Sequence, residues 1–216
     1  MKIDVVCSDP NHPVMSYLSE WRQAPCNEIH DIHVVHDVSA VTGGDIMFLL
    51  SCSQVIDDVI KKQYRHCLVL HASDLPRGRG WSPYIWNILE GDNELTVCVL
   101  EADLPVDSGD IWLRKRFSLQ GHELLPEIYS LLFAAEISLM NEVINRLSDI
   151  QPEQQDASKA SNYPRRTPED SRLDPDKSIA EQFDLLRVVD TDRFPAFFEL
   201  HGQRYILTIK KDHELY

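Results

Sequence analysis

Short, almost entirely apolar runs alternate with helical patterns through the first half of this chain, and this alternation limits its fold more than any other feature. Four of the runs have the composition of buried strands, at 2–8, 31–38, 44–53 and 66–71. Helices are expected between them at 14–21 and 55–64. Strands that are apolar throughout are typical of a parallel sheet covered on both faces. We therefore predict an α/β fold with a shortened, doubly wound and mostly parallel sheet.

The second half of the chain continues this pattern and then changes character. We expect a helix at 83–91, a strand at 94–103, a tight turn that leads into a further strand within 106–119, and a long helix at 122–150. The next stretch, 151–170, holds almost no large apolar residue, so it is predicted to be a linker or an exposed loop.

The last part of the chain, 171–216, is predicted to be a small α+β appendage. Ser178 and Glu181 have the spacing of a capping box at the start of a helix over 178–189. Two alternating runs about a Gly-containing turn predict a β-hairpin at 196–211, and pairing of this hairpin across a homodimer stays open. The chain thus divides into a body at 1–150, the linker, and the appendage.

Charge and cysteine content exclude several classes of function. The net charge of −14 over 216 residues would repel a phosphate backbone, so DNA or tRNA is a poor partner for most of this surface. The five cysteines show no CxxC pair, which is typical of reduced thiols. The N-terminal residues lack a signal-peptide pattern, and no apolar run approaches membrane-spanning length. We expect a cytoplasmic protein without a membrane partner.

Metal and nucleotide motifs are not found. His30, His33 and His36 are spaced by three residues, and on a strand such residues alternate between faces, so they are not expected to share a metal ion. No G-x-G-x-x-G or P-loop pattern occurs either. No metal cofactor is therefore predicted.

A histidine and an aspartate form the best candidate for chemistry. His71 ends the apolar run at 66–71, and Asp107 follows the strand at 94–103. Ligands of parallel α/β sheets bind at the carboxyl ends of the strands, where we expect both side chains. A carboxylate beside an imidazole favours its protonated form, which suits proton transfer or stabilisation of a developing oxyanion.

The residues around this pair resemble a known family. His-Ala-Ser-Asp-Leu-Pro at 71–76, Arg-Gly-Trp-Ser-Pro at 79–83, Trp-Asn-Ile-Leu-Glu-Gly at 86–91 and Asp-Ser-Gly at 107–109 follow one another in order. They are similar to the motifs of N10-formyltetrahydrofolate-dependent formyltransferases, whose core is shared with methionyl-tRNA formyltransferases. The chain is shorter before His71 than such a core, as though one strand–helix unit were missing.

The tail of the chain carries a second part of the resemblance. Arg-Arg-Thr-Pro-Glu-Asp at 165–170 and Pro-Ala-Phe at 195–197 look like the segment that follows the catalytic domain in sugar-nucleotide N-formyltransferases. The resemblance implies transfer of a formyl group to the amine of a nucleotide-linked amino sugar. The sugar would be a UDP-linked 4-amino-4,6-dideoxy sugar of pseudaminic acid or surface-polysaccharide biosynthesis.

The resemblance also implies roles for individual residues. His71 and Asp107 would be catalytic, whereas Val69 stands where the family has an asparagine. Either Ser51, Ser73 or a backbone N–H replaces the missing donor, or stabilisation of the transition state is weaker. The expected cofactor contacts are Gln54, Ile56, Glu101, Asp103 and Asp107. The expected substrate contacts are Ser73, Arg77, Arg79, Gly80 and Trp81; guanidinium groups suit phosphates, and an indole suits stacking on a ring.

Two other functions stay open. The same fold could formylate methionyl-tRNA or a peptide amine, although the negative charge argues against tRNA. Because Val69 lacks a donor, the chain could also be a folate- or nucleotide-sugar-binding module without chemistry.

Overall fold

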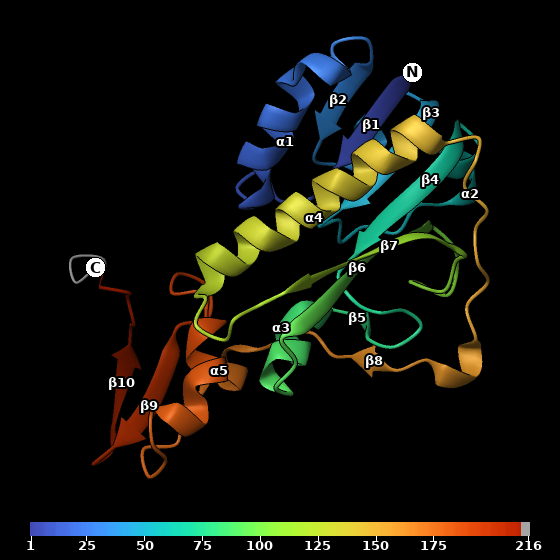
Figure 1. The fold of residues 1–216 in the computed structure, drawn as a ribbon. Coiled ribbons are helices and arrows are strands. Elements are labelled where there is room, and N and C mark those ends of the chain that lie inside the picture. The colour runs from blue at the N-terminus through green and yellow to red at the C-terminus, as the bar shows by residue number, and fades with distance from the viewer. Residues whose placement is uncertain (213–216) are drawn as a thin grey trace.

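A six-stranded sheet forms the centre of the molecule in the computed structural model, which describes residues 1–212 (Figure 1). The strand order is β2-β1-β3-β4-β6-β7. These strands are β1 Lys2–Val6, β2 Asp31–Val35, β3 Gly44–Leu50, β4 Tyr64–His71, β6 Glu94–Glu101 and β7 Ile111–Ser118. The first four are parallel, whereas β6 is antiparallel to β4 and β7 is antiparallel to β6. The predicted α/β fold with a mostly parallel sheet is confirmed.

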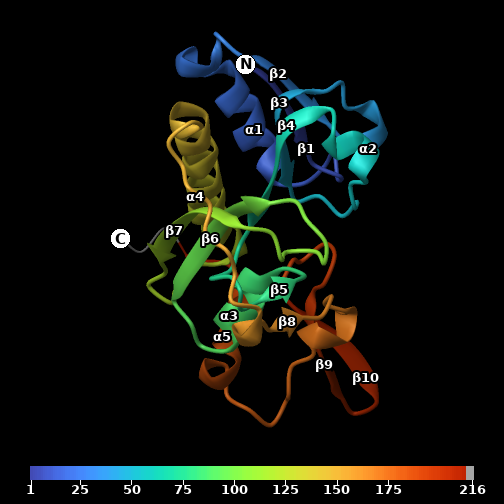
Figure 2. The same ribbon diagram turned by 90° about the vertical axis from the view of Figure 1, so that its right-hand side faces the viewer.

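Helices cover the sheet unequally. They are α1 Val14–Gln23, α2 Asp58–Lys61, α3 Pro83–Leu89, α4 Leu125–Arg146 and α5 Phe183–Arg187. The helices α1 and α4 lie on one face, and α2 lies on the other (Figure 2). The larger apolar cluster lies between the sheet and the helices α1 and α4. It contains Phe48, Leu68 and Val97 of the sheet, Leu18 of α1 and Phe133 of α4. Each such side chain stabilises the fold by about 1.5–3 kcal/mol through burial.

The long helix α4 begins as the sequence predicts. The Leu124 N–H donates a hydrogen bond to Oε2 of Glu127 at 2.8 Å, which satisfies one donor that the helix start leaves free. Pro126 lies in the first turn, where a missing N–H costs nothing.

Two predicted helices are wrong in extent. Over 55–64 only the single turn of α2 forms, and Val55 and Val59 are 63% and 70% exposed. Tyr64, the last residue of the predicted helix, instead begins β4 and pairs with Gly44 of β3. Over 178–189 the capping contacts between Ser178 and Glu181 are present, but they precede a short 3-10 turn and the five-residue α5.

The segment at 151–170 is exposed over most of its length, yet it is bound to the body. Glu153 and Ile111 exchange two backbone hydrogen bonds of 2.8 Å. Further on, β8 (Asn162–Tyr163) pairs in parallel with β5 (Arg79–Gly80), the turn that follows β4. The segment therefore runs beside the carboxyl end of β4 (Figure 1).

The C-terminal part contains α5 and the predicted hairpin, formed by β9 (Ala196–Leu200) and β10 (Gln203–Leu207). The last four residues of the predicted appendage, 213–216, lie outside the described residues.

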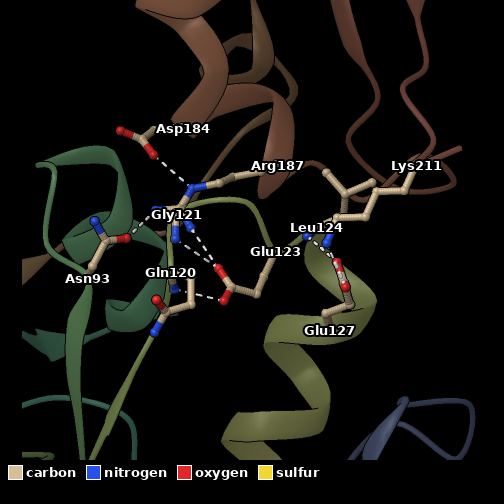
Figure 3. A network of polar contacts seen from close by, with 9 residues as sticks. All are labelled: Asn93, Gln120, Gly121, Glu123, Leu124, Glu127, Asp184, Arg187 and Lys211. Atoms are coloured by element: carbon tan, nitrogen blue, oxygen red, sulfur yellow. Dashed lines mark hydrogen bonds and ion pairs between the residues drawn. The ribbon is translucent and has the colours of Figure 1, made fainter. Parts of the chain in front are cut away.

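Arg187 of α5 ties this part to the body and is 1% exposed. Its guanidinium donates to Asp184 at 2.7 Å and to Asn93 at 2.8 Å, and lies 3.8 Å from Glu123 (Figure 3). Over residues 1–212, no helix has both the length and the apolar character needed to cross a membrane.

Candidate functional site

His71 ends β4, and its side chain is 8% exposed. Its Nε2 lies 2.8 Å from the carbonyl oxygen of Gly78. Because a carbonyl only accepts, Nε2 carries a proton and donates it in this bond. Its Nδ1 lies 3.6 Å from Oδ1 of Asp107, which is longer than a hydrogen bond. The imidazole is thus anchored at one nitrogen, and the other nitrogen faces the carboxylate loosely.

Asp107 reaches His71 by a different route from the predicted one. We expected both at the carboxyl edge of parallel strands, but β6 runs antiparallel, so His71 is paired with Cys98 and the end of β6 lies beside Leu68. The loop at 102–110 then brings Asp107 back to the turn after β4, where its Oδ2 accepts the N–H of Gly80 at 2.9 Å. The predicted pair is brought together, but the reasoning from a parallel edge is wrong.

The backbone around the pair is closely packed. Asp107 has a φ of +60°, a left-handed conformation that aspartate tolerates better than most residues. Gly80 has a φ of +98°, and a Cβ there would lie 2.4 Å from the carbonyl oxygen of Tyr163. A Cβ on Gly109 would lie 2.1 Å from the carbonyl oxygen of Glu101. Glycine is therefore required at both positions by close backbone approach.

The predicted substrate contacts lie in three surroundings. Ser73 is buried, and its Oγ has no hydrogen-bond partner among residues 1–212. Arg79 donates to Gln155 at 2.7 Å. Trp81 is 44% exposed, with the guanidinium of Arg165 4.8 Å from its ring centre.

Arg77 lies apart from these contacts. It lines a cleft of about 510 Å³ together with Lys159 and 74–76. Within the described residues its side chain makes no ion pair or hydrogen bond. The cleft is a local basic spot on an acidic chain because Arg77 is unpaired among the described residues, whereas its acidic lining residue Asp74 pairs with Arg114 at 3.7 Å and Lys159 pairs with Asp156 at 3.1 Å.

Of the predicted cofactor contacts, Asp107 lies beside His71, whereas Gln54, Ile56 and Asp103 have other neighbours. The side chain of Gln54 accepts a hydrogen bond from the N–H of Val38 at 3.0 Å and donates one to the carboxylate of Asp37 at 3.0 Å. Ile56 is buried in the apolar cluster on the α2 face. Asp103 pairs with Lys61 at 3.3 Å; the N–H of Leu104 and this lysine lower the pKa of its carboxyl.

Glu101 lies on the wrong face for a contact with His71. Glu101 pairs with Leu68, and paired residues of neighbouring strands share a face of the sheet. His71 is three residues after Leu68, so His71 and Glu101 point to opposite faces. Its Oε1 accepts the indole N–H of Trp112 at 3.0 Å, and burial raises the pKa of the carboxyl. Glu101 therefore does not contact His71, but it does line a cleft beside the loop at 102–110, so its role as a cofactor contact stays a prediction.

A second cleft, of about 480 Å³, lies beside the returning loop. Its lining is shared by three parts of the chain: Arg79, Glu101 with 103–105 and 108–110, and Gln154, Gln155 and Ala157. Neither His71 nor Asp107 is among its lining residues, because both side chains are buried.

Two further residues, Gln155 and Ser161, support the site, although no sequence pattern predicts them. The Ser161 Oγ accepts the N–H of Gly78 at 2.9 Å and so supports the turn that anchors His71. Gln155 contacts both Asp107 and Arg79. Both residues belong to a polar segment without periodicity, so no local signal separates them from exposed loop residues.

Val69 lies on the same face of β4 as His71, two residues before it, and is half-buried. Its side chain packs against buried apolar residues and offers no donor. Ser51 follows Leu50, which pairs with Leu70, and so lies next to His71 at the end of β3. Ser51 and Ser73 therefore stay the predicted hydroxyl replacements for the missing donor.

No metal site is found among residues 1–212, where no group of three or more His, Cys, Asp or Glu side chains could hold an ion. The three histidines of 30–36 have separate partners. His33 lies between Asp4 and Asp31, at 3.4 and 3.1 Å, and His36 bonds the carbonyl of Cys7 at 2.8 Å.

Comparison with known proteins connects this geometry to one family. A family model described as formyl transferase matches residues 7–144. A methionyl-tRNA formyltransferase from Rickettsia massiliae (strain Mtu5) is 27% identical over 143 residues, which are 66% of this chain and 46% of that protein. The chain thus spans less than half the length of this relative.

Three solved structures share the fold at low identity. A methionyl-tRNA formyltransferase from Clostridium thermocellum superposes with a TM-score of 0.82 and 20% identity, over 100% of this chain and 95% of that one. A 4-N formyltransferase from Francisella tularensis gives 0.76 and 17%, over 98% of both chains. HypX from Aquifex aeolicus in complex with tetrahydrofolic acid gives 0.77 and 19%, over 97% of this chain and 37% of that one.

Proposed function

Since this chain belongs to the formyl transferase family, we propose that it moves a formyl group from N10-formyltetrahydrofolate to the amine of a nucleotide-linked amino sugar. The observation that carries this proposal is the buried pair of His71 and Asp107, whose carboxylate is anchored by the N–H of Gly80. The catalytic roles of both residues are part of the proposal.

The surface beside Asp107 suits stacking of a flat aromatic ring such as a pterin. Leu104 and Val106 of the returning loop are 68% and 55% exposed, and Val55 is 63% exposed. The ion pair of Lys61 with Asp103 holds α2 against this loop. Exposed apolar side chains next to buried polar ones are typical of ligand sites. We propose that the folate lies against 52–56 and 103–107, with Glu101 at the border of the adjoining cleft.

When bound, the folate supplies a formyl carbon that an amine can attack. His71 holds one proton on Nε2 through Gly78, which leaves Nδ1 to accept a proton from the attacking amine. The charged imidazole that results can then donate this proton from Nδ1 to the developing negative oxygen. Asp107 favours the charged imidazole that results and fixes its orientation. The 3.6 Å separation is expected to shorten when substrate fills the site, as catalytic contacts often do.

Arg77 and Lys159 support a phosphorylated acceptor. The basic cleft that they line lies at the same turn that anchors His71, and guanidinium groups bind phosphate oxygens in pairs. We propose that this cleft takes the diphosphate of the nucleotide, while Trp81 and Arg79 border the acceptor.

The test is an acceptor screen. The chain is incubated with N10-formyltetrahydrofolate and UDP- or dTDP-linked amino sugars, and formylation is read as a mass increase with release of tetrahydrofolate. His71→Asn should lower kcat by about 10²–10⁴-fold, the usual contribution of a positioned acid–base group, while folate binding survives. Full activity of His71→Asn would refute the mechanism.

A second acceptor is favoured by the printed names of the relatives, which are methionyl-tRNA formyltransferases. The net charge of −14 opposes binding of a tRNA backbone. A gel-shift and formylation assay with methionyl-tRNA separates the two acceptors: transfer to tRNA without transfer to any sugar would replace the proposed substrate. Folate binding without turnover on any acceptor would instead support a binding module.

A further inference from the structure

Gln155 occupies a defined position although it lies in a polar, mostly exposed segment. Two residues before it, Glu153 exchanges backbone hydrogen bonds with Ile111 at the start of β7. Glu153 also pairs with Arg114 at 2.6 Å. The backbone next to Gln155 is therefore fixed, and this places its half-buried side chain beside the loop at 102–110.

The carboxamide of Gln155 joins two loops of the site. Its Nε2 donates to the carbonyl oxygens of Asp107 at 2.9 Å and Gly109 at 2.7 Å. Its Oε1 accepts a hydrogen bond of 2.7 Å from the guanidinium of Arg79. Both donors of the amide are used, so the orientation of the group is determined by its partners.

These hydrogen bonds flank the contact between Gly80 and Asp107, which orients the carboxylate of Asp107. The Oδ2 of Asp107 accepts from the N–H of Gly80, and Gln155 holds the backbone of Asp107 on one side and Arg79, next to Gly80, on the other. Asp107 is in a left-handed conformation, which needs support from its surroundings. Within residues 1–212 its carbonyl oxygen accepts no other hydrogen bond.

We propose that Gln155 is a positioning residue, which sets the carboxylate of Asp107 against His71 by clamping the loops that carry Asp107 and Gly80. The proposal rests on the proposed function for its kinetic consequence. Its structural consequence, the orientation of Asp107 at His71, can be measured without turnover.

Gln155→Glu is the sharpest variant. The carboxylate keeps the size of the side chain and its bond to Arg79, but it loses both N–H donors and places an oxygen against two carbonyl oxygens. We expect kcat to fall by about 10²-fold, the cost of displacing a catalytic group by roughly 1 Å, with KM values within about twofold. Gln155→Met, which has no charge and no donors, should behave in the same way.

Gln151→Glu is the matched control. It makes the same chemical change four residues earlier, at an exposed side chain without a hydrogen bond among the described residues. Its kcat and its thermal unfolding midpoint should equal those of the unmodified chain. A fall in kcat of the same size in Gln151→Glu would overturn the proposal.

A double variant tests whether Gln155 acts through Asp107. In an Asp107→Ala background the carboxylate is gone, so adding Gln155→Glu should lower the residual kcat no further. If the two losses multiply, Gln155 has an independent role and the proposal fails.

The ¹⁵N resonances of the His71 imidazole provide the readout that needs no activity. Gln155→Glu and Gln155→Met should shift these resonances and their pH titration, whereas Gln151→Glu should leave them unchanged. Unchanged His71 resonances in both Gln155 variants would refute the clamp even in an active enzyme. Shifted resonances in a chain without transferase activity would retain the clamp and refute only the proposed function.

Discussion

At the scale of single residues, Val69 is the position where this chain departs from the formyltransferases it resembles. The family motif has an asparagine there, and a side-chain amide could donate to a developing oxyanion. Val69 shares a sheet face with His71 and packs against apolar neighbours. Among residues 1–212 the buried hydroxyl of Ser73, two residues after His71, has no hydrogen-bond partner, so it is available as a replacement donor.

Val69→Asn is expected to raise kcat by about 10-fold or more. One well-placed oxyanion donor contributes about 10²–10³-fold, and part of this gain is lost because the amide must also fit among apolar side chains. The measurement is formyl transfer under saturating substrates, with Val69→Thr as a smaller polar control. A kcat that does not rise would show that the missing amide does not limit the rate.

At the scale of elements, the structure shows how strongly strand direction controls the site. The antiparallel course of β6 places Glu101 on the far face of the sheet, and the loop at 102–110 must return to bring Asp107 to His71. Gly109 permits this return, since any Cβ would collide with Glu101. The loop is therefore held by backbone packing, and Gln155 adds side-chain support.

Helix α4 carries an ionisable group on its buried face. Glu136 is 5% exposed, and its Oε2 has no hydrogen-bond partner among the described residues. Desolvation by burial raises the pKa of this carboxyl to about 8. The folded chain therefore keeps the proton to higher pH than the unfolded chain, which releases it near its ordinary pKa of 4.5.

The free energy of unfolding should consequently fall as pH rises between about 4.5 and 8, because the folded state binds the extra proton there. The full loss is on the order of 5 kcal/mol, at 1.36 kcal/mol per pKa unit. Glu136→Gln is neutral at every pH, so its thermal midpoint should exceed that of the unmodified chain by an amount that grows from pH 5 to pH 9. A pH-independent difference would contradict the assignment.

At the scale of the whole molecule, the C-terminal part is joined to the body by a buried charge. Arg187 of α5 reaches Asn93 before β6 and Glu123 before α4, besides Asp184 on its own helix. Glu123 in turn accepts the N–H groups of Gln120 and Gly121 at 2.7 and 3.0 Å (Figure 3). These hydrogen bonds help to lower the pKa of Glu123 although burial opposes them.

Arg187→Ala should lower the free energy of unfolding by about 3–5 kcal/mol, because it leaves the buried carboxylate of Glu123 without its cation. Denaturant titration measures the loss. Arg172→Ala is the control, since Arg172 pairs with Glu169 and Glu199 at the surface, where such pairs contribute about 0–1 kcal/mol. Equal losses in the two variants would contradict a joining role for Arg187.

Local patterns were enough to predict much of this molecule. Apolar runs identified the strands, the stripe at 122–150 identified α4, and the Ser178–Glu181 spacing predicted a real cap. The pairing of His71 with Asp107 was also predicted. Each of these features depends on burial or bonding within a few residues, or on motifs that stay in order along the chain.

Only the tertiary structure decided how these parts meet. The sequence does not state that β6 runs antiparallel, so it could not place Glu101 on the far face or explain the return of Asp107. The sequence also could not distinguish Gln155 from its polar neighbours. Nor could it show that only one helical turn forms within 55–64, because β4 begins at Tyr64. Strand direction, register and side-chain clamps depend on contacts between distant segments, and these contacts leave no periodic trace in the local sequence.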